Sequence, residues 1–188
     1  MVKPSFLDVP SWDDFEEKLT SLNNKEKGGY FERLTQYYFN LDPSLSSYYD
    51  SVWLLSELPE KERAYLGIPS QDLGIDIIAK TGEEYHAIQC KYHTDKNSSV
   101  TFNEVSTFIS MLEGNPKLSR GYICSTATST SKNLNKVQTK PLAHILHDTW
   151  DNLDENFFEK VKALELGKKI SPDRPLTPRP HQEKALKD

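Results

Sequence analysis

The chain has 188 residues, a formal net charge of −5, 36% hydrophobic residues and 27% charged residues. This length allows one full domain with room for an appendage. No apolar run approaches the ~20 residues that span a bilayer, and the N-terminus lacks the basic and apolar blocks of a signal peptide. We therefore exclude a membrane protein and expect a cytoplasmic one. Cys90 and Cys124 fall in predicted strands, which indicates reduced, packed thiols.

The first third of the chain is predicted to be mostly helical. Ser11 is a good N-cap followed by acids, which predicts a helix over 12–22. A second helix is expected over about 25–40. The Gly28–Gly29 pair inside it costs about 1 kcal/mol per glycine relative to alanine, so another backbone or a DNA strand is expected to approach closely there. A strand over 51–58 and a short helix over 59–67 follow.

The segment 74–93, GIDIIAKTGEEYHAIQCKYH, carries the chemistry. Asp76 opens an apolar strand, a polar turn follows, and a second strand contains Gln89, Cys90 and Lys91. Side chains alternate along a strand, so Gln89 and Lys91 share one side and Cys90 takes the other. Pairing the two strands as a hairpin brings Asp76 beside them. A carboxylate, an amide oxygen and an ammonium on one surface suit a hard metal ion and an activated water, which favours phosphodiester hydrolysis.

The rest of the chain alternates helices and strands. A helix is expected over 101–113, a buried strand over 120–125, a last strand over 142–146 and a last helix over 156–166. This alternation predicts an α/β sandwich with a mixed central sheet.

Three lysines offer a local basic strip. Lys132, Lys136 and Lys140 are spaced by four on a predicted helix that follows a loop over 126–130. The strip would suit a phosphate backbone despite the negative net charge. A solvated helix face explains the same spacing equally well.

Asp76, followed across a hairpin by Gln89-x-Lys91, resembles the pattern of the PD-(D/E)XK nuclease superfamily. Glutamine in place of the second acid is similar to the Mrr-like restriction endonuclease branch, although Ile75 stands where the superfamily name has proline. The resemblance covers about 28–125. It implies a restriction-endonuclease-like sandwich, a mixed central β-sheet flanked by helices, and Mg²⁺-dependent cleavage of double-stranded DNA.

The resemblance also implies roles for single residues. Asp76 and Gln89 would hold the metal, the backbone carbonyl of Cys90 would add an oxygen, and Lys91 would assist the attacking water. Glu32 matches a helix glutamate that the family places upstream, and would complete the metal shell; a solvated glutamate is the alternative.

Other positions are assigned on weaker grounds. His93, like Lys132 and Lys136, is a candidate DNA contact. Asp72 is either an outer-shell acid or a turn cap.

The tail differs from the rest of the chain. Four of the 11 prolines lie in 171–180, which marks a linker. The segment 176–182 resembles the Q motif that opens superfamily-two helicase ATPases, in which the glutamine, here Gln182, reads adenine. We therefore divide the chain into a nuclease domain over 1–166, with a catalytic core over about 28–146, and a linker with the start of a helicase-like ATPase over 167–188.

Together these features resemble the single-polypeptide (type ISP) restriction–modification enzymes. Such an enzyme would add an ATP-driven helicase-like motor, a methyltransferase and a target-recognition domain, and its nuclease domains would pair transiently on DNA. Two rivals stay open. A non-catalytic DNA-binding or docking module of the same fold would be expected to lose the acid or the lysine, and both are present. The sequence does not separate a structure-selective or RNA-directed nuclease.

Overall fold

The computed structural model describes residues 4–69, 74–95, 97–134, 138–168 and 170. Asp72, Lys136 and Gln182 lie outside these ranges, so their predicted roles stay predictions. The proposed division near residue 166 also stays a prediction.

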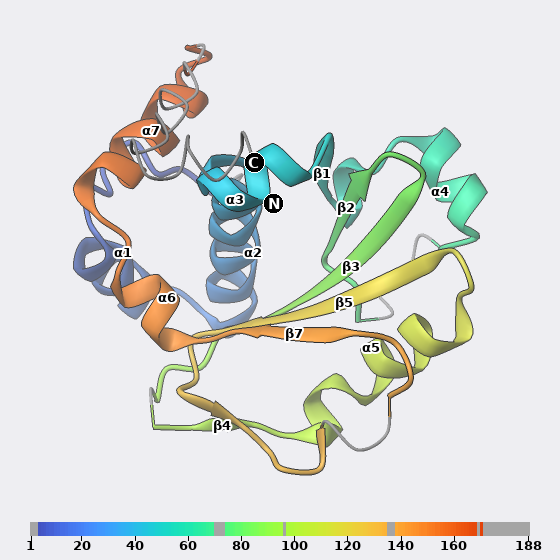
Figure 1. The fold of residues 1–188 in the computed structure, drawn as a ribbon. Helices are drawn as coiled ribbons and strands as arrows, with labels where there is room; N and C mark the ends of the chain where they lie inside the picture. The colour runs from blue at the N-terminus through green and yellow to red at the C-terminus, as the bar shows by residue number, and fades with distance from the viewer. Residues whose placement is uncertain (1–3, 70–73, 96, 135–137, 169, 171–188) are drawn as a thin grey trace, which may run out of the picture.

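The described residues form a five-stranded sheet in the order β1-β2-β3-β5-β7 (Figure 1). β1, β2 and β3 pair antiparallel, whereas β3, β5 and β7 run parallel to one another. The strands are β1 (Ser51–Leu54), β2 (Ile77–Thr81), β3 (Glu84–Lys91), β5 (Leu118–Ser125) and β7 (Leu142–Ile145). A two-stranded parallel ribbon, β4 (Ser99–Val100) with β6 (Ser129–Thr130), lies apart from this sheet.

Helices cover both faces of the sheet, so the predicted α/β sandwich is confirmed. In Figure 1, α2 lies on one side of the sheet and α5 on the other. The helices are α1 (Trp12–Thr20), α2 (Asn24–Leu41), α3 (Pro43–Tyr48), α4 (Glu60–Leu66), α5 (Phe102–Gly114), α6 (His147–Asp151) and α7 (Glu155–Glu165), with a 3₁₀ turn over Leu55–Glu57.

Each face of the sheet has its own apolar layer. The layer on the α2 side is rich in aromatic rings from α1, α2, α6 and α7. The layer on the α5 side is mainly aliphatic and includes Phe108. Strand β3 supplies both by simple alternation: Ile88 and Cys90 belong to the first layer, and Tyr85 and Ala87 to the second.

The parallel arrangement decides where a site can form. Because β3, β5 and β7 run the same way, their carboxyl ends meet at one edge of the sheet. Lys91 is the register partner of Ser125, and Cys124 is the partner of Ile145. Polar residues that follow these strands are therefore neighbours in space although they are distant in sequence.

Most expected elements are present with small shifts in their bounds. The first helix ends at Thr20, and the strand expected over 51–58 ends at Leu54 because the chain turns into the 3₁₀ turn. The short helices α3 and α6 and the two-residue strands β4 and β6 were not expected.

The lysine-bearing helix is the clear error. Within the described part of 131–141, Lys132 lies in a turn and Lys140 in a bend, and only Leu134 has 3₁₀ geometry, so these two lysines do not share a helix. Lys140 instead donates from Nζ to the carbonyls of Leu112 at 2.5 Å and Asn115 at 2.6 Å, at the end of α5. A lysine there satisfies helix-terminal carbonyls and complements the helix dipole.

Other general expectations can be checked directly. Cys90 and Cys124 are buried free thiols, as predicted. Over the described ranges, no helix combines the length and apolar character needed to cross a membrane.

A buried polar cluster lies at the start of β3, on the α2 side. Tyr49 Oη lies 2.7 Å from His86 Nδ1 and donates to Tyr122 Oη at 3.0 Å. His86 Nε2 lies 3.5 Å from Glu84 Oε2. Burial lowers the pKa of His86, with Arg120 adding to the effect, although the Glu84 carboxylate opposes it. His86 is therefore neutral near pH 7.

This cluster predicts acid sensitivity. In the unfolded chain His86 titrates near 6.5, above its folded pKa, so unfolding takes up a proton as the pH falls below about 6.5. The free energy of unfolding should fall in that range by up to about 1.4 kcal/mol per pH unit for this one proton. Urea denaturation at several pH values between about 7.5 and 5.5 measures the slope.

His86→Asn, which removes the titration, should reduce that slope. Part of the slope should persist, since burial also lowers the pKa of His144. Glu62, Glu104 and Glu113 have lowered pKa values and lose stabilisation only below about pH 4.5, outside this window. An identical slope in the variant would contradict the assignment.

Candidate active site

The site is built around the carboxylate of Asp76, which directly precedes β2. The Asp76 backbone N–H continues the β2–β3 ladder by donating to the Ile88 carbonyl at 2.9 Å. Its side-chain Oδ2 accepts two further hydrogen bonds of 2.6 Å each, from the Gln89 Nε2 amide and the Cys90 backbone N–H. The structure therefore brings together the acid and the Gln-x-Lys strand as the hairpin predicted.

Gln89 is only 4% exposed, and its amide is enclosed on the α5 side of the sheet. Besides Asp76, Gln89 Nε2 lies 3.4 Å from the Cys90 carbonyl oxygen. Gly74 borders the same side chain with φ +83°, and a Cβ there would lie 3.0 Å from Gln89 Oε1 and 2.9 Å from the backbone nitrogen of Phe108. Only glycine fits both this backbone conformation and this space.

Lys91 and Cys90 separate to opposite faces of the sheet, as predicted. Cys90 packs in the layer on the α2 side. Burial raises the pKa of its thiol, and the nearby negative charges of Asp76 and Glu32 raise it further, whereas the neighbouring Thr35 hydroxyl opposes them. Lys91 is half-buried, and its positive charge acts on Glu104 of α5.

Glu32 reaches this region from α2. Its charge acts on the same thiol as that of Asp76, so the two acids flank Cys90 from a helix and from the sheet. The next residues of α2 fix the helix to β1 and to the 3₁₀ turn after it: Arg33 donates to Glu57 at 2.6 Å, and Gln36 donates to the Val52 carbonyl at 3.1 Å.

The glycine pair of α2 is one turn from Glu32. A Cβ added at Gly29 would meet nothing within 4 Å in the described structure, and one at Gly28 would meet only Glu32 Oε1 at 4.0 Å. A neighbouring protein backbone therefore does not explain these glycines. A DNA strand at this position stays a prediction.

Two residues at this edge escaped the sequence analysis. Thr126, which follows β5, accepts from the His93 backbone N–H at 2.7 Å and donates to the His93 carbonyl at 2.9 Å. Glu104, in the first turn of α5, lies 3.3 Å from His93 Nε2. Burial acts to raise the pKa of Glu104, but hydrogen bonds from Thr101 and the charges of His93 and Lys91 outweigh it, and the pKa lies below its usual value.

Trp150 of α6 supports the site from behind. Its indole Nε1 donates to the carbonyl of Ser125 at 2.8 Å, at the end of β5. Its ring meets Phe31 edge-on, with centroids 5.0 Å apart, and also packs on Tyr38. The carboxyl end of β5 and helix α2 are thereby fixed to one buried side chain.

The proposed basic strip is not assembled as expected. Lys132 is exposed just after β6, and Lys140 is engaged at the end of α5. His93, the other candidate DNA contact within the described residues, lies 3.3 Å from Glu104 through its Nε2.

The donor set can be tested against a metal ion. Within the described ranges, no three residues of the types His, Cys, Asp and Glu are grouped to hold a metal. The site instead offers three different oxygen donors: the Asp76 carboxylate, the Gln89 amide oxygen and the Cys90 carbonyl. The Gln89 Nε2 nitrogen lies 2.6 Å from the Asp76 carboxylate and 3.4 Å from the Cys90 carbonyl oxygen. Mg²⁺ takes oxygen ligands, is commonly bound by one or two carboxylates and keeps several waters. The residues present fit such an ion.

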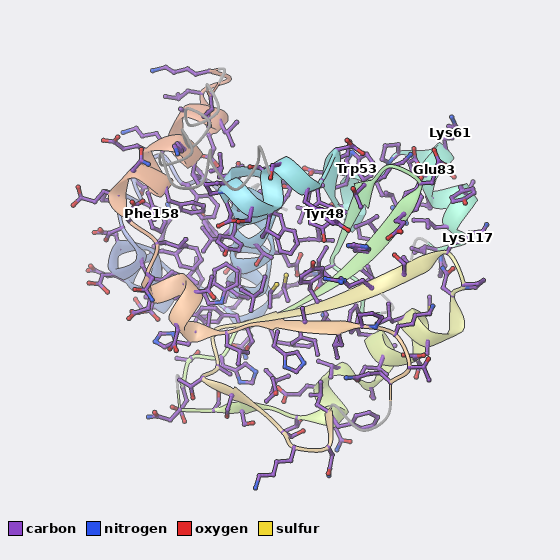
Figure 2. All side chains as sticks on the ribbon, in the orientation of Figure 1. Tyr48, Trp53, Lys61, Glu83, Lys117 and Phe158 are labelled. Atoms are coloured by element: carbon purple, nitrogen blue, oxygen red, sulfur yellow. The ribbon has the colours of Figure 1, made fainter. Side chains whose placement is uncertain are left out.

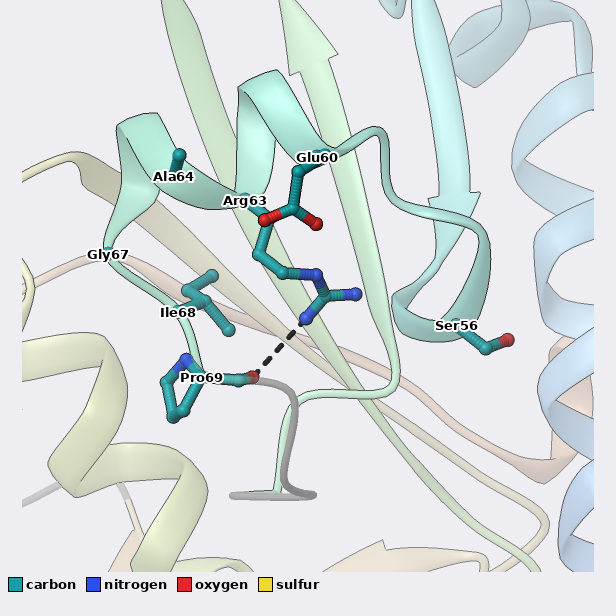
Figure 3. Close-up of a pocket in the computed structure, with 7 residues that line it drawn as sticks. All are labelled: Ser56, Glu60, Arg63, Ala64, Gly67, Ile68 and Pro69. Atoms are coloured by element: carbon teal, nitrogen blue, oxygen red, sulfur yellow. Dashed lines mark hydrogen bonds between the residues drawn. The ribbon is translucent and has the colours of Figure 1, made fainter.

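An open pocket of about 670 Å³ lies elsewhere, around α4 (Figure 3). Arg63 crosses it and donates to the Pro69 carbonyl at 3.2 Å. None of the predicted site residues lines it. Lys61 and Lys117 mark this end of the molecule, away from α6 and the carboxyl ends of the parallel strands (Figure 2).

A mixed sheet between helix layers, with an acid and a Gln-x-Lys strand at the edge where its parallel strands end, defines a nuclease of the restriction endonuclease type. Residues 40–162, more than half of the chain, match the Mrr-type restriction endonuclease family. The chain belongs to that family of restriction endonucleases. Membership indicates a requirement for a divalent metal. The matched region contains Asp76, Gln89, Lys91 and Glu104 but not Glu32.

Solved structures share this fold. The chain is 25% identical to the ATP-dependent type ISP restriction–modification enzyme LlaBIII bound to DNA, with a TM-score of 0.64 over 94% of this chain and 10% of that one. The MspJI restriction endonuclease in complex with a 27-mer oligonucleotide shares the fold at 15% identity, with a TM-score of 0.51 over 86% of this chain and 36% of that one.

The modification-dependent endonuclease AspBHI also shares the fold, at 14% identity, with a TM-score of 0.50 over 89% of this chain and 43% of that one. This chain therefore spans less than half the length of each of these enzymes. No curated protein matches the sequence.

The enclosure of Gln89 gives a test. Gly74→Ala should displace either Gln89 or α5, because its Cβ would lie 2.9 Å from a backbone nitrogen at a φ of +83°. We expect a loss of about 1–3 kcal/mol in the free energy of unfolding and a fall in DNA cleavage of about 10-fold or more.

Gly82→Ala is the matched control. Gly82 has φ +55° but nothing within 4 Å of an added Cβ, so it incurs backbone strain without the clash. Equal losses of cleavage in the two variants would contradict the role given to Gly74.

Proposed function

We propose that this chain is a Mg²⁺-dependent DNA endonuclease domain with Asp76, Gln89 and Lys91 as its catalytic residues. The observation that carries the proposal is the meeting of the Asp76 carboxylate, the Gln89 amide and the Cys90 N–H through contacts of 2.6 Å, with Lys91 on the same side of β3 as Gln89. Glu32 is proposed to complete the metal shell from α2.

Each side chain has a distinct task in this proposal. Asp76, Gln89 and the Cys90 carbonyl would hold the metal, which when bound supplies Lewis acidity at the phosphate and makes water a better nucleophile. To do so, the Gln89 amide would turn its oxygen toward the ion and give up its hydrogen bond to Asp76. A rotation about one bond is enough, since amide oxygen and nitrogen are nearly equal in size.

Lys91 would act on the nucleophile and the phosphate. Its ammonium can orient the attacking water and offset the negative charge that builds up on the phosphate in the transition state. Water attacks phosphorus in line and the 3′ oxygen leaves, which gives 5′-phosphate and 3′-hydroxyl ends.

We propose further that the chain is the nuclease part of a type ISP restriction–modification enzyme, driven along DNA by ATP. The likeness to LlaBIII over 94% of this chain, at 25% identity, supports this proposal, as does the resemblance of 176–182 to a helicase Q motif. The helicase-like, methyltransferase and target-recognition domains, adenine recognition by Gln182, a cytoplasmic location and transient pairing of two nuclease domains on DNA all belong to it.

Plasmid cleavage by the full-length protein with Mg²⁺ tests the site. Asp76→Asn can still accept from the Cys90 N–H but lacks the charge, and Lys91→Ala removes the ammonium. Each should reduce cleavage by about 100-fold or more, while ATP hydrolysis, where present, persists. Chelation with EDTA should stop cleavage by the wild type.

The controls are an acid and a lysine far from the site. Glu60→Gln and Lys61→Ala, both exposed residues of α4, should cleave like the wild type. If Asp76→Asn cleaves normally, the metal is held elsewhere. If the wild type binds DNA but does not cut it, a docking module becomes the better description.

A further inference from the structure

The carboxylate of Glu104 is divided between two tasks. Its Oε2 accepts from the Thr101 backbone N–H at 2.7 Å and from the Thr101 hydroxyl at 2.6 Å, which closes the N-terminus of α5. Its Oε1 lies 3.3 Å from Nε2 of His93. Each oxygen thus has its own partner, and the second partner belongs to the segment that follows β3.

His93 is fixed at its backbone as well. Thr126 accepts from its N–H and donates to its carbonyl, at 2.7 and 2.9 Å, so the position of the residue is set by the end of β5. The ring is 17% exposed and comes two residues after Lys91, whose charge acts on the same Glu104. A phosphate bound at Lys91 would therefore be close to the His93 ring.

The charge of Glu104 is unfavourable at this place if it acts alone. A carboxylate beside a DNA backbone repels the phosphates and weakens binding. A carboxylate that accepts from one imidazole nitrogen, however, fixes the orientation of the ring and leaves the other nitrogen for a ligand. With an acid on one side and a phosphate on the other, an imidazolium can donate to both.

We propose that Glu104 is a positioning residue that holds His93 in the orientation in which its Nδ1 donates to a DNA phosphate next to the scissile one. The proposal rests on the proposed function, because it takes the carboxyl end of β3 as the place where DNA lies. Glu104 does not contact the reacting atoms and acts through His93.

The direction in which Glu104→Gln changes DNA affinity separates a positioning role from simple charge repulsion, because loss of a repelling charge alone would tighten binding. Affinity for a short fluorescent DNA duplex is measured by anisotropy, without divalent metal, for the full-length wild type, Glu104→Gln, His93→Gln and the double variant. A glutamine has one carbonyl oxygen, which can serve the Thr101 cap or the His93 ring but not both. We expect Glu104→Gln to weaken binding about 3- to 10-fold and to lower the salt slope by about 1, although it removes a negative charge.

The double variant tests whether Glu104 acts through His93. If it does, the double variant binds DNA no more weakly than His93→Gln alone. Thr101→Val is the matched structural control: it weakens the cap of α5 but keeps the Glu104 charge. It should lower the melting temperature and leave DNA affinity unchanged.

Tighter or unchanged binding by Glu104→Gln, or additive effects in the double variant, would overturn the proposal. Because the binding assay needs neither metal nor cleavage, it remains decisive for Glu104 if the wild type fails to cut DNA. That failure would count against the proposed function alone.

Discussion

The arrangement of the candidate active site depends on one oxygen atom of Asp76. Oδ2 of Asp76 accepts from a backbone N–H and from a side-chain amide of the adjacent strand. Hydrogen bonds to a charged group contribute about 1.5–3 kcal/mol each, so this carboxylate joins the two strands and sets the Gln89 rotamer at once. The close approach of Gly74 and the burial of Gln89 follow from that one arrangement. Removing the charge therefore affects both the local fold and the chemistry proposed for it.

The negative net charge is compatible with a DNA enzyme because charge here is organised locally. Glu32 approaches the site from one face of the sheet and Glu104 from the other, with Lys91 and His93 between sheet and solvent. An acidic side chain that is paired with a cationic one repels distant DNA phosphates only weakly. The pair is nearly neutral overall, and salt screens its field beyond the Debye length of about 8 Å. The overall charge of −5 therefore says little about this edge.

The sequence was informative where neighbours in space are neighbours in the chain. The hairpin, with its strict alternation and single turn, correctly predicted that Asp76 lies against Gln89 and Cys90; the role of Lys91 beside them stays a prediction. Glu104 and Thr126 were missed because they reach the site only through the parallel pairing of β3 with β5 and the crossover through α5, neither of which leaves a local pattern. Strands of two residues such as β4 are too short for periodicity to detect.

The prediction of a lysine-bearing helix was wrong for a related reason. Spacing by four imitates a helix face, but the tertiary position of Lys140, against the end of α5, decides its role.

The burial of Trp150 close to the candidate active site makes its fluorescence a useful probe. Its indole is buried, donates to the end of β5 and touches α2 through Phe31. Indole emission depends on the polarity and rigidity of its surroundings, so the chain carries a natural optical reporter one layer behind its candidate active site. Of the other two tryptophans, Trp12 packs on Phe15 in α1 and Trp53 lies on β1. Replacing those two with phenylalanine would leave Trp150 as the single tryptophan, whose emission could follow metal or DNA binding without a label.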